Sequence, residues 1–181
     1  LLPTLSRIDK QAQRAGAIIR NIRTLVGKQN PHHELTDINR LIKNTIELAQ
    51  VDVNCRAIRF ECDFFEQLPM VEIVLGQIQQ VILNLIRNAC DAMITTSADQ
   101  KYITFISENH PVGFITIRVR DRGIGINRDH NDKLFRAFFS TKSYGMGMGL
   151  AISHSIISNH GGEMKINHQY KDGAEIIFTL P

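Results

Sequence analysis

The sequence lacks several features that would place it in other protein classes. Its three cysteines form no Cys-x-x-Cys pair and are odd in number, which predicts buried free thiols in a reducing, cytoplasmic compartment. It has no signal peptide and no apolar run near the roughly 20 residues that cross a bilayer. We therefore expect no membrane contact by this chain. No GxxxxGK[ST] motif of the P-loop proteins is present.

Charge and histidine content exclude two further kinds of site. The net charge is only +3, and the basic residues are spread along the chain, whereas nucleic-acid binding needs a clustered basic patch. The seven histidines are scattered, and His32, His33, His154 and His160 lack convincing ligand partners. We expect neither a nucleic-acid partner nor a structural metal. With 181 residues, 43% of them hydrophobic, the chain can form one domain with its own core plus an appendage.

Residues 121–150 contain two clusters of glycine. The second cluster alternates as Gly145, Gly147 and Gly149 just before an apolar run that predicts a helix. Glycine allows positive φ and has no Cβ, so backbone N–H groups can close on an anion. A helix N-terminus adds unpaired donors that suit phosphate, and Lys142 could supply a full charge nearby. This pattern favours a phosphate-binding loop.

The first glycine cluster follows a predicted strand. Residues 114–120 alternate between apolar and polar side chains, and Asp121 ends that run two residues before Gly123, which Gly125 follows. A carboxylate at a strand end beside a glycine turn is an acceptor to which the amino group of a base could donate. Taken alone, both clusters could still be ordinary glycine-rich turns.

A predicted helix, 78–93, adds a third motif to the two glycine clusters. Asn84 and Asn88 are four residues apart and share one helical face, while Val81, Leu85 and Cys90 can face inward. With the glycine clusters, this helix resembles the histidine-kinase and GHKL ATPase superfamily. The four matching motifs are an N box (Asn84-Leu85-x-x-Asn88-Ala89), a G1 box (Asp121 to Ile126), an F box (Leu134 to Phe139) and a G2 box (Gly145 to Leu150). The run FFSTKSYGMGMGLAIS most resembles the FixL and NtrB branch of bacterial sensor kinases.

The resemblance implies a fold, two cofactors and a set of site residues. The implied fold is a two-layer α/β sandwich, the Bergerat or GHKL ATP-binding fold, with a mixed sheet and the nucleotide between helices and lid. The implied cofactors are ATP and Mg²⁺, with Asn88 as the metal ligand, Asn84 beside the phosphates and Asp121 on the adenine amino group. Asn84, Asn88 and Lys142 are the expected catalytic residues. The expected ATP-binding residues are Asn84, Asn88, Asp121, Gly123, Gly125, Ile126, Phe135, Thr141, Lys142, Gly145, Gly147, Gly149 and Leu150. Arg87 and Arg136 are further candidates for phosphate binding. Phe135, Phe138 and Phe139 are expected to anchor the lid, the segment between the F and G2 boxes.

The sequence departs from the family pattern in two places. Many sensor kinases have Lys-Tyr or Lys-Phe where this chain has Asp91-Ala92, which shifts the phosphate-contacting role to Lys142. Hydrolytic relatives such as gyrase and MutL have a Glu where this chain has Gln80. An amide is a poor general base near neutral pH. Glu72 lies two helical turns before Gln80, too far from the expected site to replace it. These residues favour transfer to a protein acceptor over hydrolysis.

The N-terminal segment has a heptad pattern. Apolar residues from Leu5 to Val26 step by three and four, which predicts a helix that needs a partner helix; a plain amphipathic surface helix is the alternative. The resemblance identifies 1–30 as the second helix of a dimerisation and phosphotransfer hairpin, with the phosphoacceptor His expected before Leu1. His33 begins a partial match to the family's H box but falls after the heptad helix, in a linker, 31–37, marked by Gly27 and Pro31, so we do not expect it to be the acceptor.

The catalytic domain is expected over 38–181. We predict a helix start at Thr36 or Asp37, with further elements from periodicity and turn residues. The predicted elements are helix 38–49, strand 58–62, a short edge strand at 69–71, an N-box helix starting around Glu72, a hairpin of 102–106 with 114–119, helix 150–159 ending at Gly161-Gly162, and strands 163–167 and 174–180 joined at 171–173.

The predicted function is that of the ATP-binding catalytic domain of a sensor histidine kinase. The parent would transfer the γ-phosphoryl group of ATP to its own His and then to an Asp on a response-regulator receiver domain. We expect the parent to be a homodimer, cytoplasmic or anchored in the bacterial inner membrane. Two alternatives remain open: an ATP-hydrolysing conformational machine of the gyrase or MutL kind, and a nucleotide-binding module without catalysis.

Overall fold

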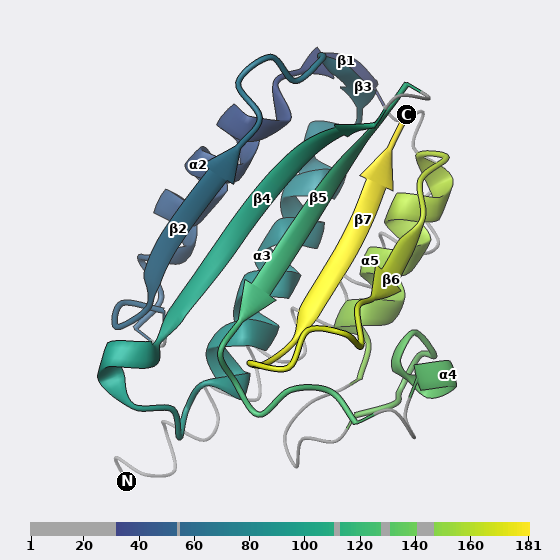
Figure 1. Ribbon diagram of the computed structural model, residues 1–181. Coiled ribbons are helices and arrows are strands. Elements are labelled where there is room, and N and C mark those ends of the chain that lie inside the picture. Colours follow the sequence, from purple (N-terminus) through teal and green to yellow (C-terminus); the bar gives the residue numbers. More distant parts are fainter. Residues whose placement is uncertain (1–31, 54, 111–112, 128–130, 141–146) are drawn as a thin grey trace, which may run out of the picture. The chain divides into compact units, whose positions relative to one another are not determined.

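A mixed sheet forms one layer of the fold. The computed structural model describes residues 32–53, 55–110, 113–127, 131–140 and 147–181. Within them, five strands pair in the order β2-β4-β5-β7-β6, and only the β2–β4 pair is parallel (Figure 1). The strands of this sheet are β2 (Arg59–Phe64), β4 (Tyr102–His110), β5 (Phe114–Asp121), β6 (Met164–Ile166) and β7 (Glu175–Leu180).

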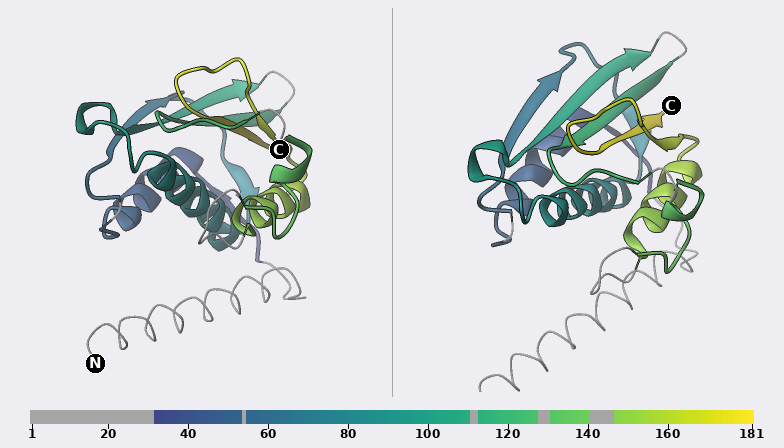
Figure 2. Two further views of the ribbon diagram at one scale, coloured as in Figure 1. Left: turned by 90° about the horizontal axis from the view of Figure 1, so that it is seen from below. Right: turned by 60° about the horizontal axis from the view of Figure 1, so that its bottom comes forward.

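Three helices cover one face of this sheet, as the two views of Figure 2 show. They are α2 (Ile38–Ala49), α3 (Leu75–Ala92) and α5 (Gly149–Asn159). The helix α3 lies in the middle, in contact with α2, α5 and β5. The result is the two-layer α/β sandwich that the sequence predicts. The short elements α4 (Asn131–Leu134) and η1 (Ala98–Gln100) lie in connections.

The periodicity of α3 decides which side chains it buries and which it leaves at the surface of the layer. Its buried residues follow a spacing of three and four, so they form one apolar stripe against the sheet. They are Ile78, Val81, Ile82, Leu85, Ile86, Ala89 and Cys90. Asn84 and Asn88 lie beside this stripe and are half-buried. The helix thus presents two amides next to the core without burying them.

The helix α2 begins where the sequence predicts. Asp37 is its N-cap, with the side chain accepting a hydrogen bond from the Arg40 N–H at 3.1 Å. Such a cap satisfies one of the backbone donors that a helix start leaves unpaired. The C-terminus of α5 is likewise as predicted, because Gly161 follows it with a φ of +76°.

The segment before the N-box helix differs from the prediction. The sequence predicts a strand at 69–71 and a helix start near Glu72, but β3 spans Val71–Ile73 and α3 begins at Leu75. The strand extends further because Val71 and Ile73 are both buried. Its antiparallel partner is β1 (Glu34–Thr36), in a stretch predicted to be a linker.

Some predictions concern residues outside the described part of the chain. They include the heptad helix of 1–30 and three expected ATP-binding residues, Thr141, Lys142 and Gly145. The prediction that all three cysteines are buried is wrong for Cys62, which is exposed on the edge strand β2. Among the described helices, none has both the length and the apolar character to cross a bilayer.

Candidate nucleotide-binding site

The first part of the site joins the N-box helix to the start of α5. The Asn84 amide Nδ2 lies 3.4 Å from the Gly149 carbonyl oxygen and 3.4 Å from Ser153 Oγ. Ser153 is fully buried, so its hydroxyl is a fixed acceptor in the core. These contacts set the orientation of Asn84 toward the N-terminus of α5. That N-terminus is where unpaired backbone donors favour phosphate.

The second part is the carboxylate at the end of β5. Asp121 is 9% exposed, and its Oδ1 accepts hydrogen bonds from the Gly123 N–H at 2.8 Å and the Ala174 N–H at 3.2 Å. The two donors come from different segments, the G1 turn and the start of β7. Because both bonds use Oδ1, they fix the plane of the carboxylate. A carboxylate oriented in this way is a directional acceptor.

The G1 turn packs directly against the end of α3. A Cβ on Gly123 would lie 2.6 Å from the Ala92 Cβ and 2.8 Å from the Ala92 backbone carbon and oxygen. The Ile124 N–H donates to the Ala92 carbonyl at 3.3 Å. Only glycine permits this approach, and it couples the position of Asp121 to that of the N-box helix.

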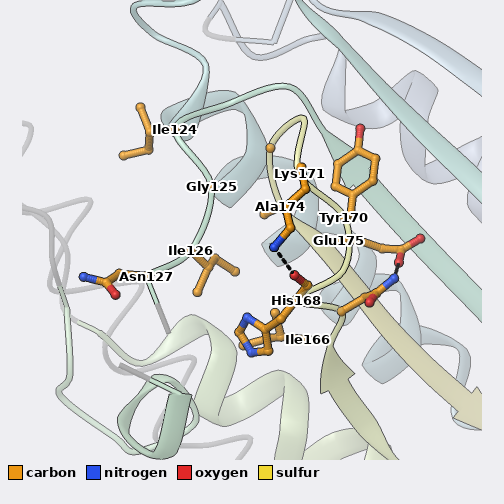
Figure 3. Close-up of a pocket in the computed structure, with 12 residues that line it drawn as sticks. Ile124, Gly125, Ile126, Asn127, Ile166, His168, Tyr170, Lys171, Ala174 and Glu175 are labelled. Carbon is orange, nitrogen blue, oxygen red and sulfur yellow. Dashed lines mark hydrogen bonds between the residues drawn. The ribbon is translucent and has the colours of Figure 1, made fainter. Parts of the chain in front are cut away.

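The turn between β6 and β7 completes this side of the site. Gly125 has a φ of +75°, and a Cβ on it would lie 3.1 Å from the Gly173 carbonyl oxygen. A hollow of about 300 Å³ separates the G1 turn from the β6–β7 turn (Figure 3). Its lining residues are Ile124, Gly125, Ile126, Asn127, Ile166, Asn167, His168, Tyr170, Lys171, Gly173, Ala174 and Glu175. It adjoins Asp121 through Ala174, while Asn84 and Asn88 do not line it.

A buried acid holds the β6–β7 turn in place. Glu175 is fully buried, forms ion pairs with Arg120 and Arg118, and accepts a hydrogen bond from the Asn167 amide. Leaving a buried charge without its partner is costly, on the order of 3–5 kcal/mol. These contacts therefore fix both ends of the turn relative to β5. At the tip of the turn, Asp172 pairs with Arg122 at 2.9 Å.

The F box contacts α5 at one point and the G2 box at another. The Phe135 ring packs on the His154 ring with centroids 4.9 Å apart. Gly147 has a φ of +64°, and a Cβ there would lie 2.2 Å from the Phe139 carbonyl oxygen, so this glycine lets the F box and the G2 box meet. Phe138, in contrast, is 79% exposed with a φ of 68°, so its ring is not an anchor in this arrangement.

A histidine ties together the ends of α3 and α5 that lie away from the glycine loops. The N–H of Val74, the N-cap of α3, donates to His160 Nε2 at 3.1 Å, and His160 Nδ1 lies 2.8 Å from the Ile156 carbonyl. Because a backbone N–H can only donate, Nε2 is the acceptor and Nδ1 carries the proton. Burial lowers the pKa of His160 below its ordinary value of 6.5.

The structure places many of the predicted residues in two groups. One contains Asn84 and, at the start of α5, Gly149 and Leu150; the other contains Asp121, Gly123, Gly125 and Ile126. Asn88 follows Asn84 by one turn on α3. Among the described residues, no group of three His, Cys, Asp or Glu side chains is arranged to hold a metal ion. The roles of Asn88 in metal binding and of Lys142 in phosphate binding stay predictions.

The sequence predicts the β6–β7 turn but gives neither this turn nor Ser153 a part in the site. Ser153 is four residues after Gly149, on the face of α5 that meets α3, and this spacing was a usable signal. Asn167 and Glu175 meet only through sheet pairing and the turn, because they are eight residues apart in the sequence. No local pattern marks such a contact.

Comparison with known proteins identifies the family. Residues 74–181 match the family described as Histidine kinase-, DNA gyrase B-, and HSP90-like ATPase. The chain is 38% identical over 184 residues to the sensor protein FixL of Bradyrhizobium diazoefficiens, covering 98% of this chain and 35% of that protein. It is 32% identical over 168 residues to the sensor protein TdiS of Thauera aromatica, covering 92% of this chain and 31% of that one. The chain thus spans about a third of the length of these relatives.

Solved structures show the same fold. The catalytic domain of the histidine kinase ThkA superposes with a TM-score of 0.70 at 27% identity, over 82% of this chain and 95% of that one. Full-length ShkA in complex with AMPPNP superposes with a TM-score of 0.75 at 22% identity, over 91% of this chain and 34% of that one. The chain belongs to the histidine kinase-, DNA gyrase B- and HSP90-like ATPase family and contains an ATP-binding domain of the sensor histidine kinase type.

Proposed function

We propose that this domain positions Mg²⁺–ATP so that its parent protein transfers the γ-phosphoryl group to a histidine on a dimerisation hairpin. Phosphoryl transfer asks a protein mainly for positioning and charge neutralisation. The single observation that carries the proposal is the alignment of Asn84 with the start of α5 through Gly149 and Ser153. The alignment places an amide beside the helix N-terminus where the phosphates would lie.

The base would bind at the other end of the site. Asp121, oriented by the Gly123 and Ala174 N–H groups, would accept a hydrogen bond from the adenine amino group. Gly123 and Gly125 keep side chains out of the space between the G1 turn and its neighbours. Lys142 and the glycines Gly145, Gly147 and Gly149 would surround the phosphates. The AMPPNP bound to the structural neighbour ShkA supports a nucleotide in this fold.

The residues present fit a magnesium ion. Mg²⁺ prefers oxygen ligands and binds through one or two protein groups, phosphate oxygens and retained waters. Asn88 offers an amide oxygen on the half-buried face of α3, one turn beyond Asn84, and needs no further protein ligand in such a site. The ion, when bound, would neutralise charge on the phosphates. Asn88 would hold it, and Asn84 would keep the phosphate chain aligned with α5.

The departures from hydrolytic relatives favour transfer over hydrolysis. Gln80 lies on α3 one turn before Asn84, and its amide cannot act as a general base for water. Glu72 lies in β3 and not in the helix. The acceptor would then be a protein side chain, with relay to an Asp on a receiver domain. We also propose that the parent acts as a homodimer and that this domain works in the cytoplasm.

Calorimetry with AMPPNP, with and without Mg²⁺, tests the proposal on this chain. The substitution Asn88→Ala should remove most of the gain in affinity that Mg²⁺ provides, whereas Asn44→Ala on the exposed surface of α2 should not. Equal Mg²⁺ dependence in both variants would contradict the assigned role of Asn88. Absence of any AMPPNP binding would instead favour a module that has lost its nucleotide.

Phosphate release and labelling separate the remaining alternatives. A kinase domain without its acceptor should release phosphate slowly and take up no stable label from ATP. Steady-state release that disappears in Gln80→Ala would support a hydrolytic machine. Stable labelling that is lost in His33→Ala would show that the phosphoacceptor is His33, which immediately precedes β1 and packs its ring against His160.

A further inference from the structure

Two buried cysteines meet on the side of α3 that the proposed nucleotide site does not use. Cys55 Sγ and Cys90 Sγ are 2.7 Å apart, and the residues are 1% and 5% exposed. A covalent S–S bond is about 2.04 Å long, so the two sulfur atoms need to move only roughly 0.7 Å to reach bonding distance. Neither thiol has a part in the nucleotide site described above.

Both cysteines belong to segments with fixed backbones. Cys90 is in the last two turns of α3. Cys55 lies in the connection between α2 and β2, where its N–H donates to the Asp52 carbonyl and its carbonyl accepts from the Ile58 N–H, each at 3.0 Å. These backbone contacts place the two sulfur atoms close together in the folded chain. Metal binding is a weaker explanation, because among the described residues no third ligand joins them.

We propose that Cys55 and Cys90 form an intramolecular disulfide under peroxide and that this bond stabilises the domain without closing the nucleotide site. The Sγ of one cysteine, as its thiolate, attacks a peroxide oxygen, the O–O bond breaks, and a sulfenic acid and one water form after protonation. The second sulfur then attacks the sulfenic sulfur and displaces a second water. Two thiols and one hydrogen peroxide thus give one disulfide and two waters.

The surroundings of the two cysteines predict both slow oxidation to the disulfide and slow reduction of it. Burial is the main cause that raises the pKa of both thiols above the ordinary value of 9.0, and thiolate is the reactive form. Peroxide is small enough to reach the sulfur atoms during local opening, whereas bulky thiols and aromatic disulfides are excluded. Once formed, the bond would resist glutathione for the same reason. Cys62, exposed on β2, provides an internal reference for an accessible thiol.

The disulfide should leave the amide face of α3 unchanged. Successive residues of a helix are 100° apart around its axis, so Cys90 lies about 200° around the axis from Asn88, on nearly the opposite face of α3. The bond would connect α3 to the α2–β2 connection and close a loop of about 36 residues. A loop of this size restricts the unfolded chain appreciably. The expected effect is a rise in Tm of roughly 5–10 °C, with AMPPNP affinity within about twofold of that of the reduced chain.

Peptide mapping of the peroxide-treated chain tests the proposal. Free thiols are blocked with N-ethylmaleimide in denaturant, the chain is digested without reductant, and the peptide masses are measured by mass spectrometry. The expected product is a peptide pair linking Cys55 to Cys90, lighter by about 2 Da than the two reduced peptides. It should form in Cys62→Ser as well, and in neither Cys55→Ala nor Cys90→Ala.

Several results would overturn the proposal. One is full N-ethylmaleimide labelling of Cys55 and Cys90 after peroxide treatment of the folded chain. Another is a disulfide that involves Cys62 or a second chain. A linked pair with an unchanged or lower Tm would refute the stabilising role, and a loss of AMPPNP binding confined to the oxidised form would refute the separation from the nucleotide face. If the reduced chain also fails to bind AMPPNP, the proposed function is at fault and the mapping result still stands. Because the wild-type chain itself supplies the decisive peptide map, poor folding of an alanine variant would not affect the outcome.

Discussion

The substitution Asp121→Asn should change which nucleotide base the domain prefers. Asp121 Oδ1 accepts two backbone N–H bonds, from Gly123 and Ala174. An Asn oxygen can accept the same two bonds, so the fold should survive with a loss below about 1 kcal/mol. The amide NH₂ then replaces the carboxylate oxygen on the base side. It would face the adenine amino group donor to donor, whereas the carbonyl of hypoxanthine is an acceptor.

The size of the effect follows from the charge that is lost. A hydrogen bond to a charged group contributes about 1.5–3 kcal/mol, so ATP affinity should fall by roughly 10- to 150-fold. Inosine triphosphate should lose much less or bind better than it does to the unsubstituted chain. Calorimetry with both nucleotides measures the ratio of affinities. A matched control is Asp172→Asn, which removes a carboxylate from the exposed β6–β7 turn.

Two outcomes would refute this reasoning. One is an ATP affinity that stays within twofold in a folded Asp121→Asn chain. The other is a parallel fall for ATP and inosine triphosphate, because that result would mean a general distortion and not a change in base recognition. A fall of equal size in Asp172→Asn would point to long-range charge as the cause.

Three further predictions follow from contacts in and around the site. The substitution Gly123→Ala, whose Cβ would overlap the Ala92 backbone, should destabilise the domain by about 1–3 kcal/mol and lower its Tm by several degrees in a thermal melt; an unchanged Tm would show that the G1 turn yields freely. Removal of the buried hydroxyl in Ser153→Ala should loosen Asn84, cost about 1 kcal/mol and weaken AMPPNP binding a few-fold by calorimetry, and unchanged binding would argue against the alignment. The pKa of His160 is lowered in the folded state, so the unfolded chain takes up a proton first as the pH falls below the ordinary pKa of 6.5. The free energy of unfolding in urea should therefore decrease between pH 6.5 and the folded-state pKa, and above pH 6.5 it should not depend on this group. The variant His160→Gln should show a smaller decrease, and an identical pH profile would exclude His160 as its source.

The motifs of the site could be predicted from the sequence because they depend on local spacing. The Asn84 and Asn88 pair occupies one helical face wherever a helix forms, and Gly123 follows Asp121 at the end of an alternating run. The same local rules located the N-cap at Asp37. Helix and strand periodicity thus gave the layers of the fold, and the motif resemblance gave the family.

Contacts between distant segments could not be predicted in this way. The pairing of β1 with β3 moves the start of α3 to Leu75, because Thr36, 35 residues earlier in the chain, pairs with Val71 and keeps it in a strand. The buried Glu175 and its arginines arise from cross-strand register. A charged residue in a strand usually indicates an exposed face, and only the register shows that two arginines neutralise this one. The same limit applies to the Cys55 and Cys90 contact.

The crystal structure of this chain with Mg²⁺ and AMPPNP is the most direct test of the central claim. We predict the adenine amino group within hydrogen-bond distance of the Asp121 carboxylate, and the phosphates between Asn84 and the N-terminus of α5. A nucleotide bound elsewhere would contradict the claim, for example with its base against Lys171 and His168 on the far side of the β6–β7 hollow and its phosphates away from α3.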